Sequence, residues 1–319
     1  MDWSARALRH ELGYQAMLVL LAGARVVPLP ALRAFGAALA RLLIPLFPTE
    51  IATTRAHLAL AFPERDERWR EEMLATCRRH LGLLVGEVAW LWSARSAQIL
   101  ERTQFVGLEH LTSGLSAGTG VVLVTGHVGN WEWLNLSLGS AGIPMSVAAR
   151  EVYDPRLDQV SQRLRGRFGG ETILRGENAG KRLLRALQDG RCVGLLIDQD
   201  IDAPGAFVEF FGRPAWTPTG AAFMALRAGS PAVTAFAVRL PNGAMRVTVK
   251  PVALTSTGDL RADSAAITAA FTAEIEQAIR TQPAQWVWMH DRWRRQPAAG
   301  EKVWAVPAAP PADAGASLR

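Results

Sequence analysis

The sequence predicts an α/β protein in which helices flank a mixed central sheet, preceded by an apolar, helical N-terminal region. Short β-branched runs alternate with helical patterns from about residue 105 onward. Before that point, apolar residues recur at the three- and four-residue spacing of helices. The 319 residues, 49% hydrophobic and 20% charged, are enough for one large α/β domain with a helical attachment and do not suit disorder.

Apolar stretches fill most of residues 1–50, beginning with Tyr14–Ala24. Basic residues interrupt them every eight positions, at Arg25, Arg33 and Arg41, which predicts a shared helical face broken by Pro28 and Pro30. No uninterrupted run reaches the ~20 residues of a simple membrane span. We expect residues 1–50 to anchor the protein to a membrane as interfacial or tilted helices. A cleaved signal peptide and buried helices of a soluble protein are the alternatives.

Residues 51–297 are expected to form the main domain. Its strands are predicted at 121–125, 145–149, 193–197, 232–239 and 245–252. Its helices are predicted at 53–63, 67–92, 130–138, 155–168, 177–188, from 217 to 229, and at 265–280. The turn residues Pro241-Asn242-Gly243 predict that the last two strands form a hairpin. The Pro/Ala-rich segment 298–319 is expected to be a disordered tail.

The composition limits the partners. A net charge of +6 attracts phosphate-rich or acidic molecules, such as anionic lipid, an acidic carrier protein or nucleic acid. No motif for nucleic acid is present, so no nucleic-acid partner is expected. Eleven Trp residues fit either a core or a membrane interface. The two cysteines, Cys77 and Cys192, form no CxxC pair or disulfide framework, which fits a reducing compartment.

One motif carries recognisable chemistry, Gly126-His127-Val128-Gly129-Asn130-Trp131-Glu132, directly after a predicted strand. Ligands of open α/β sheets bind at the carboxyl ends of strands. Asn130 can cap the next helix, which places Glu132 in its first turn. A carboxylate there can bind one imidazole nitrogen of His127 and leave the other to take a proton from a hydroxyl. With no nucleophile nearby, direct attack of that hydroxyl is the predicted mechanism.

Two plainer interpretations of His127 remain. A histidine at a strand end can simply cap a turn. A metal site would need two or three further ligands, and the closest other histidine is His110, so no metal is expected.

The motif GHVGNWEW resembles the H-x4-(D/E) signature of the bacterial lipid A biosynthesis acyltransferases. Four further segments follow the family pattern in the same order: 54–64, Asp198-Gln199, Phe210-Phe211-Gly212 and 286–297. The resemblance covers residues 10–297. The chain departs from the pattern at His57, where Asn is expected.

The resemblance implies a glycerolipid-acyltransferase-like fold anchored at the cytoplasmic face of the inner membrane. It implies an acyl-carrier-protein thioester as donor, a hydroxyl of a lipid A precursor as acceptor, and no cofactor. His127 and Glu132 would be the catalytic pair. Further residues are expected to contact substrate, through phosphates, the thioester or the space beside His127: Asn130, Arg150, Arg165, Asp198 and Gln199.

Two alternatives stay open. An enzyme of the same family can acylate another lipid or glycolipid, from acyl-CoA in place of the carrier protein. A non-catalytic membrane-binding protein can keep the same fold, in which case His127 and Glu132 would be dispensable.

Overall fold

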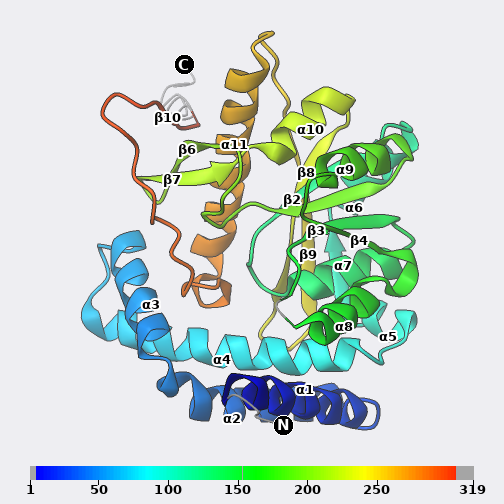
Figure 1. The fold of residues 1–319 in the computed structure, drawn as a ribbon, viewed down its shortest axis with the longest axis vertical. Helices are drawn as coiled ribbons and strands as arrows, with labels where there is room; N and C mark the ends of the chain where they lie inside the picture. Colours follow the sequence, from blue (N-terminus) through cyan, green and yellow to red (C-terminus); the bar gives the residue numbers. More distant parts are fainter. Residues whose placement is uncertain (1–4, 153, 307–319) are drawn as a thin grey trace, which may run out of the picture.

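The computed structural model describes residues 5–152 and 154–306 (Figure 1). Its main sheet has seven strands in the order β1-β9-β8-β2-β5-β3-β4, and every neighbouring pair is parallel except the β8/β9 hairpin. The strands are β1 Thr103–Val106, β2 Val121–Thr125, β3 Met145–Ala149, β4 Glu171–Leu174, β5 Cys192–Leu196, β8 Ala232–Arg239 and β9 Met245–Val252. The mixed sheet confirms the predicted fold class, and the predicted hairpin is present.

Helices cover both faces of this sheet (Figure 1). They are α5 Ser96–Leu100, α6 Leu108–Ser116, α7 Trp131–Ser140, α8 Pro155–Arg165, α9 Ala179–Gln188, α10 Gly220–Ala228 and α11 Leu260–Thr281. Alternate residues of β2 feed two hydrophobic cores. Val122 and Val124 pack on the face with α9, α10 and α11, and Val121 and Leu123 pack on the face with α6 and α7. A strand buried on both faces accounts for its continuous apolar run.

A second, smaller sheet has the order β10-β6-β7, with β6 Gly205–Phe210, β7 Arg213–Pro218 and β10 Val303–Trp304. It corrects two predictions. Thr217 and Pro218 do not begin a helix but end β7, where Thr217 pairs with Ala206 and its hydroxyl binds buried Arg292. Part of the expected disordered tail pairs with β6, while residues 307–319 lie outside the described ranges.

The N-terminal region consists of helices that lie below the main sheet in the view of Figure 1. They are α1 Ala5–Gly23, α2 Leu29–Leu43, a 3-10 turn at Ile44–Leu46, α3 Pro48–Ala61 and α4 Glu67–Leu91. α2 crosses α4 at backbone contact, since a Cβ on Gly36 would lie 2.1 Å from the Gly82 carbonyl oxygen. Arg33 points into this contact, where its Nε donates to Glu87 at 2.8 Å. The predicted arginine face is therefore absent: Arg33 faces inward, whereas Arg41 is exposed.

The outer surface of these helices is apolar. Leu29–Leu46 is the one described segment with the length and composition of a membrane span, and only 22% of it is buried. Large apolar side chains exposed on this surface are Val19, Val26, Phe35, Leu42, Leu46 and Phe47. Exposed apolar patches of this kind mark interaction surfaces, and a membrane is one such partner.

Candidate active site

His127 and Asp198 meet because their strands are neighbours in register. β2 and β5 are parallel, with Thr125 opposite Leu196, so the residues two positions beyond each strand face each other. The Nδ1 atom of His127 lies 2.8 Å from Oδ1 of Asp198. The His127 backbone N–H also donates to Asp198 Oδ2, at 2.6 Å. The expectation that Asp198 lies beside His127 is confirmed.

Asp198 is held as a carboxylate although it is buried. Its Oδ2 accepts a third hydrogen bond, from the indole Nε1 of Trp286 at 2.8 Å. Burial alone would raise the pKa of the Asp198 carboxyl, but His127 and these hydrogen bonds lower it to about 2. The carboxylate therefore binds the protonated Nδ1 of the imidazole and leaves Nε2 as the basic atom.

Gln199 connects two imidazole rings. Its Nε2 lies 3.3 Å from Nε2 of His127 and 2.6 Å from Nε2 of His290. An amide nitrogen donates but does not accept, so both Nε2 atoms accept and both rings are neutral with their proton on Nδ1. Burial and the nearby His127 lower the pKa of His290, although Asp198 opposes them. His290 was not among the expected site residues, and its only signal was its place in segment 286–297.

Glu132 does not have the partner expected for it. Its carboxylate binds the guanidinium of Arg165, with Nε at 2.9 and 3.1 Å from the two oxygens and Nη2 at 2.5 Å from Oε1. The first turn of α7 faces the end of α8, where Arg165 is the last residue, whereas Asp198 already occupies Nδ1 of His127. Burial would lower the pKa of Arg165, but Glu132 more than offsets this and raises it.

Asn130 holds the motif in place. It is fully buried, its Oδ1 caps α7 by accepting the Trp133 N–H, and its Nδ2 donates to Glu87 at 2.9 Å. The same Glu87 carboxylate binds Arg33 and Arg239. The capping role predicted for Asn130 is present, but the expected substrate contact is replaced by these internal hydrogen bonds.

The motif turn also needs glycine. Gly129 has φ +67°, and a Cβ there would lie 2.0 Å from the Ala237 carbonyl oxygen on β8. Any larger residue would push the segment carrying His127 away from the sheet.

Arg150 follows β3, two strands from β2 along the same edge of the sheet, and is exposed. Within residues 5–152 and 154–306 its guanidinium forms no ion pair.

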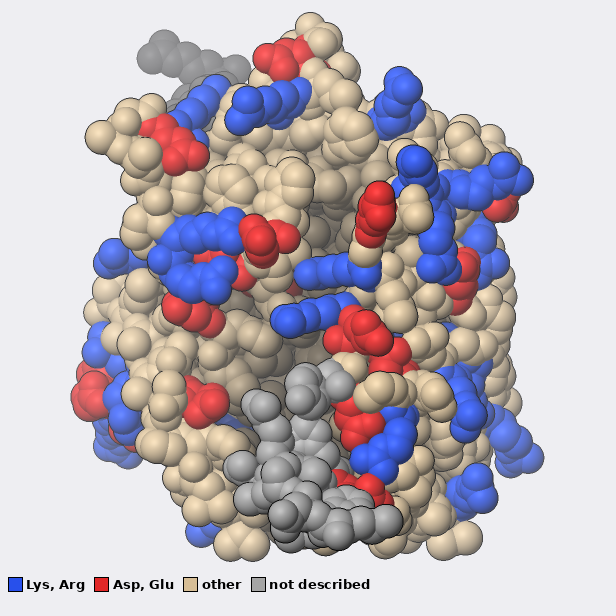
Figure 2. Space-filling model, viewed as in Figure 1, with Lys and Arg blue, Asp and Glu red and all other residues tan. Residues whose placement is uncertain are grey.

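Figure 2 shows that the viewed face is hollowed near its centre, with basic side chains across the hollow and acidic ones beside them. The surface here carries both charges rather than one uniform basic patch.

Aromatic residues from the remaining family-like segments pack behind Asp198. Phe210 is fully buried and contacts both Trp286 and Trp293, so it fills the core here. Arg292 is also buried and donates to the Trp216 carbonyl at 2.5 Å. Among the described residues, no three His, Cys, Asp or Glu side chains are grouped so as to hold a metal ion.

An imidazole backed by a buried carboxylate lies here at the carboxyl ends of parallel strands, and this arrangement is chemically able to activate a hydroxyl. Comparison with known proteins shows what class of enzyme this is. Residues 1–295 match the family described as bacterial lipid A biosynthesis acyltransferase, and the chain belongs to that family. It is thus an acyl-transferring enzyme of lipid A or glycolipid biosynthesis.

Three relatives show how wide this family is. The chain is 26% identical to the lipid A biosynthesis lauroyltransferase of Escherichia coli (strain K12), over 85% of this chain and 88% of that protein. It is 24% identical to the palmitoleoyltransferase of the same strain, over 85% and 87%. It is 29% identical to the phosphatidylinositol mannoside acyltransferase of Mycolicibacterium smegmatis (strain ATCC 700084 / mc(2)155), over 60% and 63%.

Proposed function

We propose that this enzyme transfers a fatty acyl chain from an acyl-carrier-protein thioester to a hydroxyl of a lipid A precursor. The observation that carries the proposal is the His127–Asp198 pair, which leaves the basic Nε2 of His127 facing away from the buried carboxylate. Family membership supports acyl transfer, and two of the relatives are named for lipid A biosynthesis.

His127 is the general base in this mechanism. Its Nε2 takes the proton of the acceptor hydroxyl while the hydroxyl oxygen forms a bond to the thioester carbonyl carbon. The tetrahedral intermediate collapses, the carbon–sulfur bond breaks, and the imidazolium returns the proton to the leaving thiolate. Asp198 holds Nδ1–H and stabilises the imidazolium through the transfer. No acyl-enzyme is formed.

Gln199 and the acceptor hydroxyl compete for the same atom in this scheme, Nε2 of His127. The amide now donates to Nε2 of His127, which is the atom that must receive the hydroxyl proton. Substrate entry therefore requires Gln199 to turn toward His290, with which it has the shorter contact. The freed N–H can then donate to the carbonyl oxygen as negative charge develops on it.

Glu132 works through Arg165 in this proposal. The bidentate pair fixes a guanidinium at the end of α8, beside the motif helix. A guanidinium in this position can bind the thioester carbonyl or a phosphate. Glu132 therefore belongs to the catalytic centre as the residue that positions Arg165, and His127 carries the proton.

The enzyme works at a membrane surface in this proposal. Its substrate is a lipid, and the exposed apolar residues of α1 and α2 are suited to enter a bilayer interface. The exposed Arg25 and Arg41 flank that surface and attract anionic headgroups. We infer attachment to the cytoplasmic face of the inner membrane, where an acyl carrier protein can supply the donor.

A second acceptor is favoured by one comparison. The mycobacterial relatives are named phosphatidylinositol mannoside acyltransferases, so another glycolipid can be the acceptor. Purified enzyme should be given acyl-carrier-protein and acyl-CoA donors with a lipid A precursor or a phosphatidylinositol mannoside. Turnover of the lipid A precursor with the carrier-protein donor supports the proposal. Turnover of the mannoside alone would make the mannoside the acceptor in place of the lipid A precursor. Turnover from acyl-CoA alone would make acyl-CoA the donor in place of the carrier-protein thioester.

A further inference from the structure

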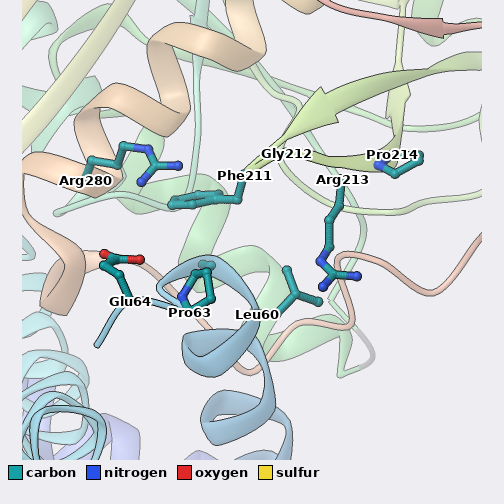
Figure 3. A pocket seen from close by; sticks show the side chains of 9 residues that line it. Leu60, Pro63, Glu64, Phe211, Gly212, Arg213, Pro214 and Arg280 are labelled. Atoms are coloured by element: carbon teal, nitrogen blue, oxygen red, sulfur yellow. The ribbon is translucent and has the colours of Figure 1, made fainter. Parts of the chain in front are cut away.

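A surface cavity of about 540 Å³, shown in Figure 3, is lined by other residues than the His127 site. It opens between the end of α3, the β6–β7 turn and the end of α11. Its principal lining residues are Leu60, Pro63, Glu64, Phe211, Arg213 and Arg280. None of His127, Asp198, Gln199 and His290 lines it. Its volume is in the range of small-molecule sites.

The cavity is held in shape by one carboxylate. Phe211 has φ +53°, a backbone conformation that is costly for a bulky side chain. Its N–H donates to Glu276 Oε2 at 2.6 Å, and the other oxygen of Glu276 accepts from Arg280 Nε at 2.8 Å. The Arg280 guanidinium lies 4.5 Å from the Phe211 ring centre. Glu276 thus fixes an aromatic wall and a basic wall together.

The lining carries more positive than negative charge. Arg213 is exposed, and within the described parts of the chain its guanidinium has no ion-pair partner. Figure 3 shows Arg213 and Arg280 on opposite sides of Phe211. Glu64 is the one acidic residue of the lining, and its ion pair, at 3.7 Å, is with Arg65. Arg280 is already paired with Glu276, at 2.7 Å, so Arg213 is the lining arginine whose charge has no acidic partner among the described residues.

We propose that this cavity binds a phosphate ester of one of the two substrates, with Arg213 and Arg280 donating to the phosphate. Guanidinium groups match phosphate oxygens in geometry and charge, and Phe211, Pro63 and Leu60 offer an apolar surface to the adjoining part of the ligand. The proposal rests on the proposed function, because both substrates carry this group. The donor has the phosphate of its pantetheine arm, and the acceptor has its headgroup phosphates.

The cavity is physically connected to the catalytic pair. Phe211 contacts Trp288 at 6.0 Å between ring centres, and Trp288 contacts Trp286 at 4.6 Å. Trp286 in turn donates to Asp198. Packed aromatic side chains therefore join the Phe211 wall of the cavity to the carboxylate that holds His127.

The test compares Arg213→Ala with Arg246→Ala. Arg246 is also an exposed arginine at a strand position, and it lies on β9 away from the cavity. KM is measured for the carrier-protein thioester and for an acyl-pantetheine thioester without phosphate, and for the acceptor with and without its phosphates. Arg213→Ala should raise KM about tenfold for one phosphorylated substrate and leave its phosphate-free counterpart unchanged. The substrate affected identifies the source of the phosphate.

The proposal is overturned if Arg213→Ala matches Arg246→Ala with all four substrates, or if it raises KM equally with and without phosphate. A calorimetric titration with 4′-phosphopantetheine and with the phosphorylated acceptor separates this proposal from the proposed function, because it needs no turnover. Binding of either probe that is weakened about tenfold in Arg213→Ala supports the cavity even if no acyl transfer occurs. Binding of both probes that is independent of Arg213 overturns it.

Discussion

Asp198 binds His127 twice, through the imidazole Nδ1 at 2.8 Å and through the backbone N–H at 2.6 Å. The two contacts fix both the ring and the turn that carries it. Although burial would raise the pKa of this carboxyl, His127 and the hydrogen bonds lower it to about 2, so the group is ionised at neutral pH. The pair is therefore set to keep one tautomer of His127.

Replacing Asp198 with Asn should lower kcat/KM by about 10² to 10⁴ while the fold is retained. The amide no longer stabilises the imidazolium, and it can select the other tautomer. The comparison variant is Asp202→Asn, in the same loop, whose side chain is fully exposed. Steady-state kinetics of the two variants give the result, and equal activity would remove Asp198 from the mechanism.

Glu132 and Arg165 should behave as one unit. Glu132→Gln and Arg165→Ala are each expected to lower kcat/KM by at least about tenfold, and the double variant should lose little more than either single one. The physical reason is that the two side chains hold each other in position through their ion pair. Fully additive losses in this double-mutant cycle would show that Glu132 acts independently of Arg165.

Replacing Gln199 with Glu should lower kcat/KM at neutral pH more than replacing it with Ala does. Gln199→Ala removes a donor, whereas Gln199→Glu places a carboxylate between His127 and His290, which favours a proton on each Nε2. The Glu variant should therefore lose more activity at neutral pH and regain part of it as the pH rises. A pH profile of kcat/KM for both variants checks this, and parallel profiles would contradict the assigned tautomers.

Stability should fall as the pH drops below about 6.5. Burial and the neighbouring Arg239 lower the pKa of His80 from 6.5 to about 3, so the unfolded chain binds a proton that the folded one does not. The stabilisation is complete above pH 6.5 and is lost progressively toward pH 3, on the order of 5 kcal/mol in total. The lowered pKa of Asp198 reduces the free energy of unfolding only when the pH falls below 3.8, the ordinary pKa of this group.

Urea unfolding of wild type and His80→Asn at pH 7 and pH 5 measures this effect. The wild type should lose more free energy of unfolding between the two values than the variant does. His57 and His290, whose pKa values are also lowered by burial, should leave part of the pH dependence in the variant. An identical loss of free energy of unfolding in both proteins would mean that a group other than His80 causes the pH dependence.

The apolar surface of α2 should bind lipid. Phe35→Asp and Leu42→Asp place charges on exposed positions of that surface and should reduce sedimentation with anionic vesicles. Phe223→Asp, an exposed position on α10, should have no such effect. Equal sedimentation of all three variants would mean that another surface meets the membrane.

The sequence predicted the central strands well because β2, β5 and β8 are largely buried on both faces, while β9 alternates buried with more exposed residues. β2, β3, β8 and β9 have the predicted bounds, and β5 is shifted by one residue. The strands that were missed, such as β1 with the sequence TQFV and β4 with ETIL, are short and partly exposed, so they carry no continuous apolar run. β7 was mistaken for a helix start because its last residues, Thr217 and Pro218, also suit an N-cap.

The site was predictable where strand ends marked it and not where strand order mattered. His127 and Asp198 each follow a buried run, but their contact depends on β2 and β5 being neighbours. Glu132 was the nearer carboxylate along the chain, so local spacing favoured it as the partner of His127. His290 lies in an irregular segment, and only the folded chain brings it to Gln199.

We propose above all that His127 is the general base with which this enzyme acylates a lipid A precursor. The most direct measurement is a mass spectrum of lipid A from the source bacterium with this gene deleted, complemented by wild type or by His127→Ala. We expect the deletion to lack one acyl chain, the wild type to restore it, and the variant, made in equal amount, to fail. Restoration by His127→Ala would contradict the assignment of the base, and unchanged lipid A in all strains would contradict the acceptor.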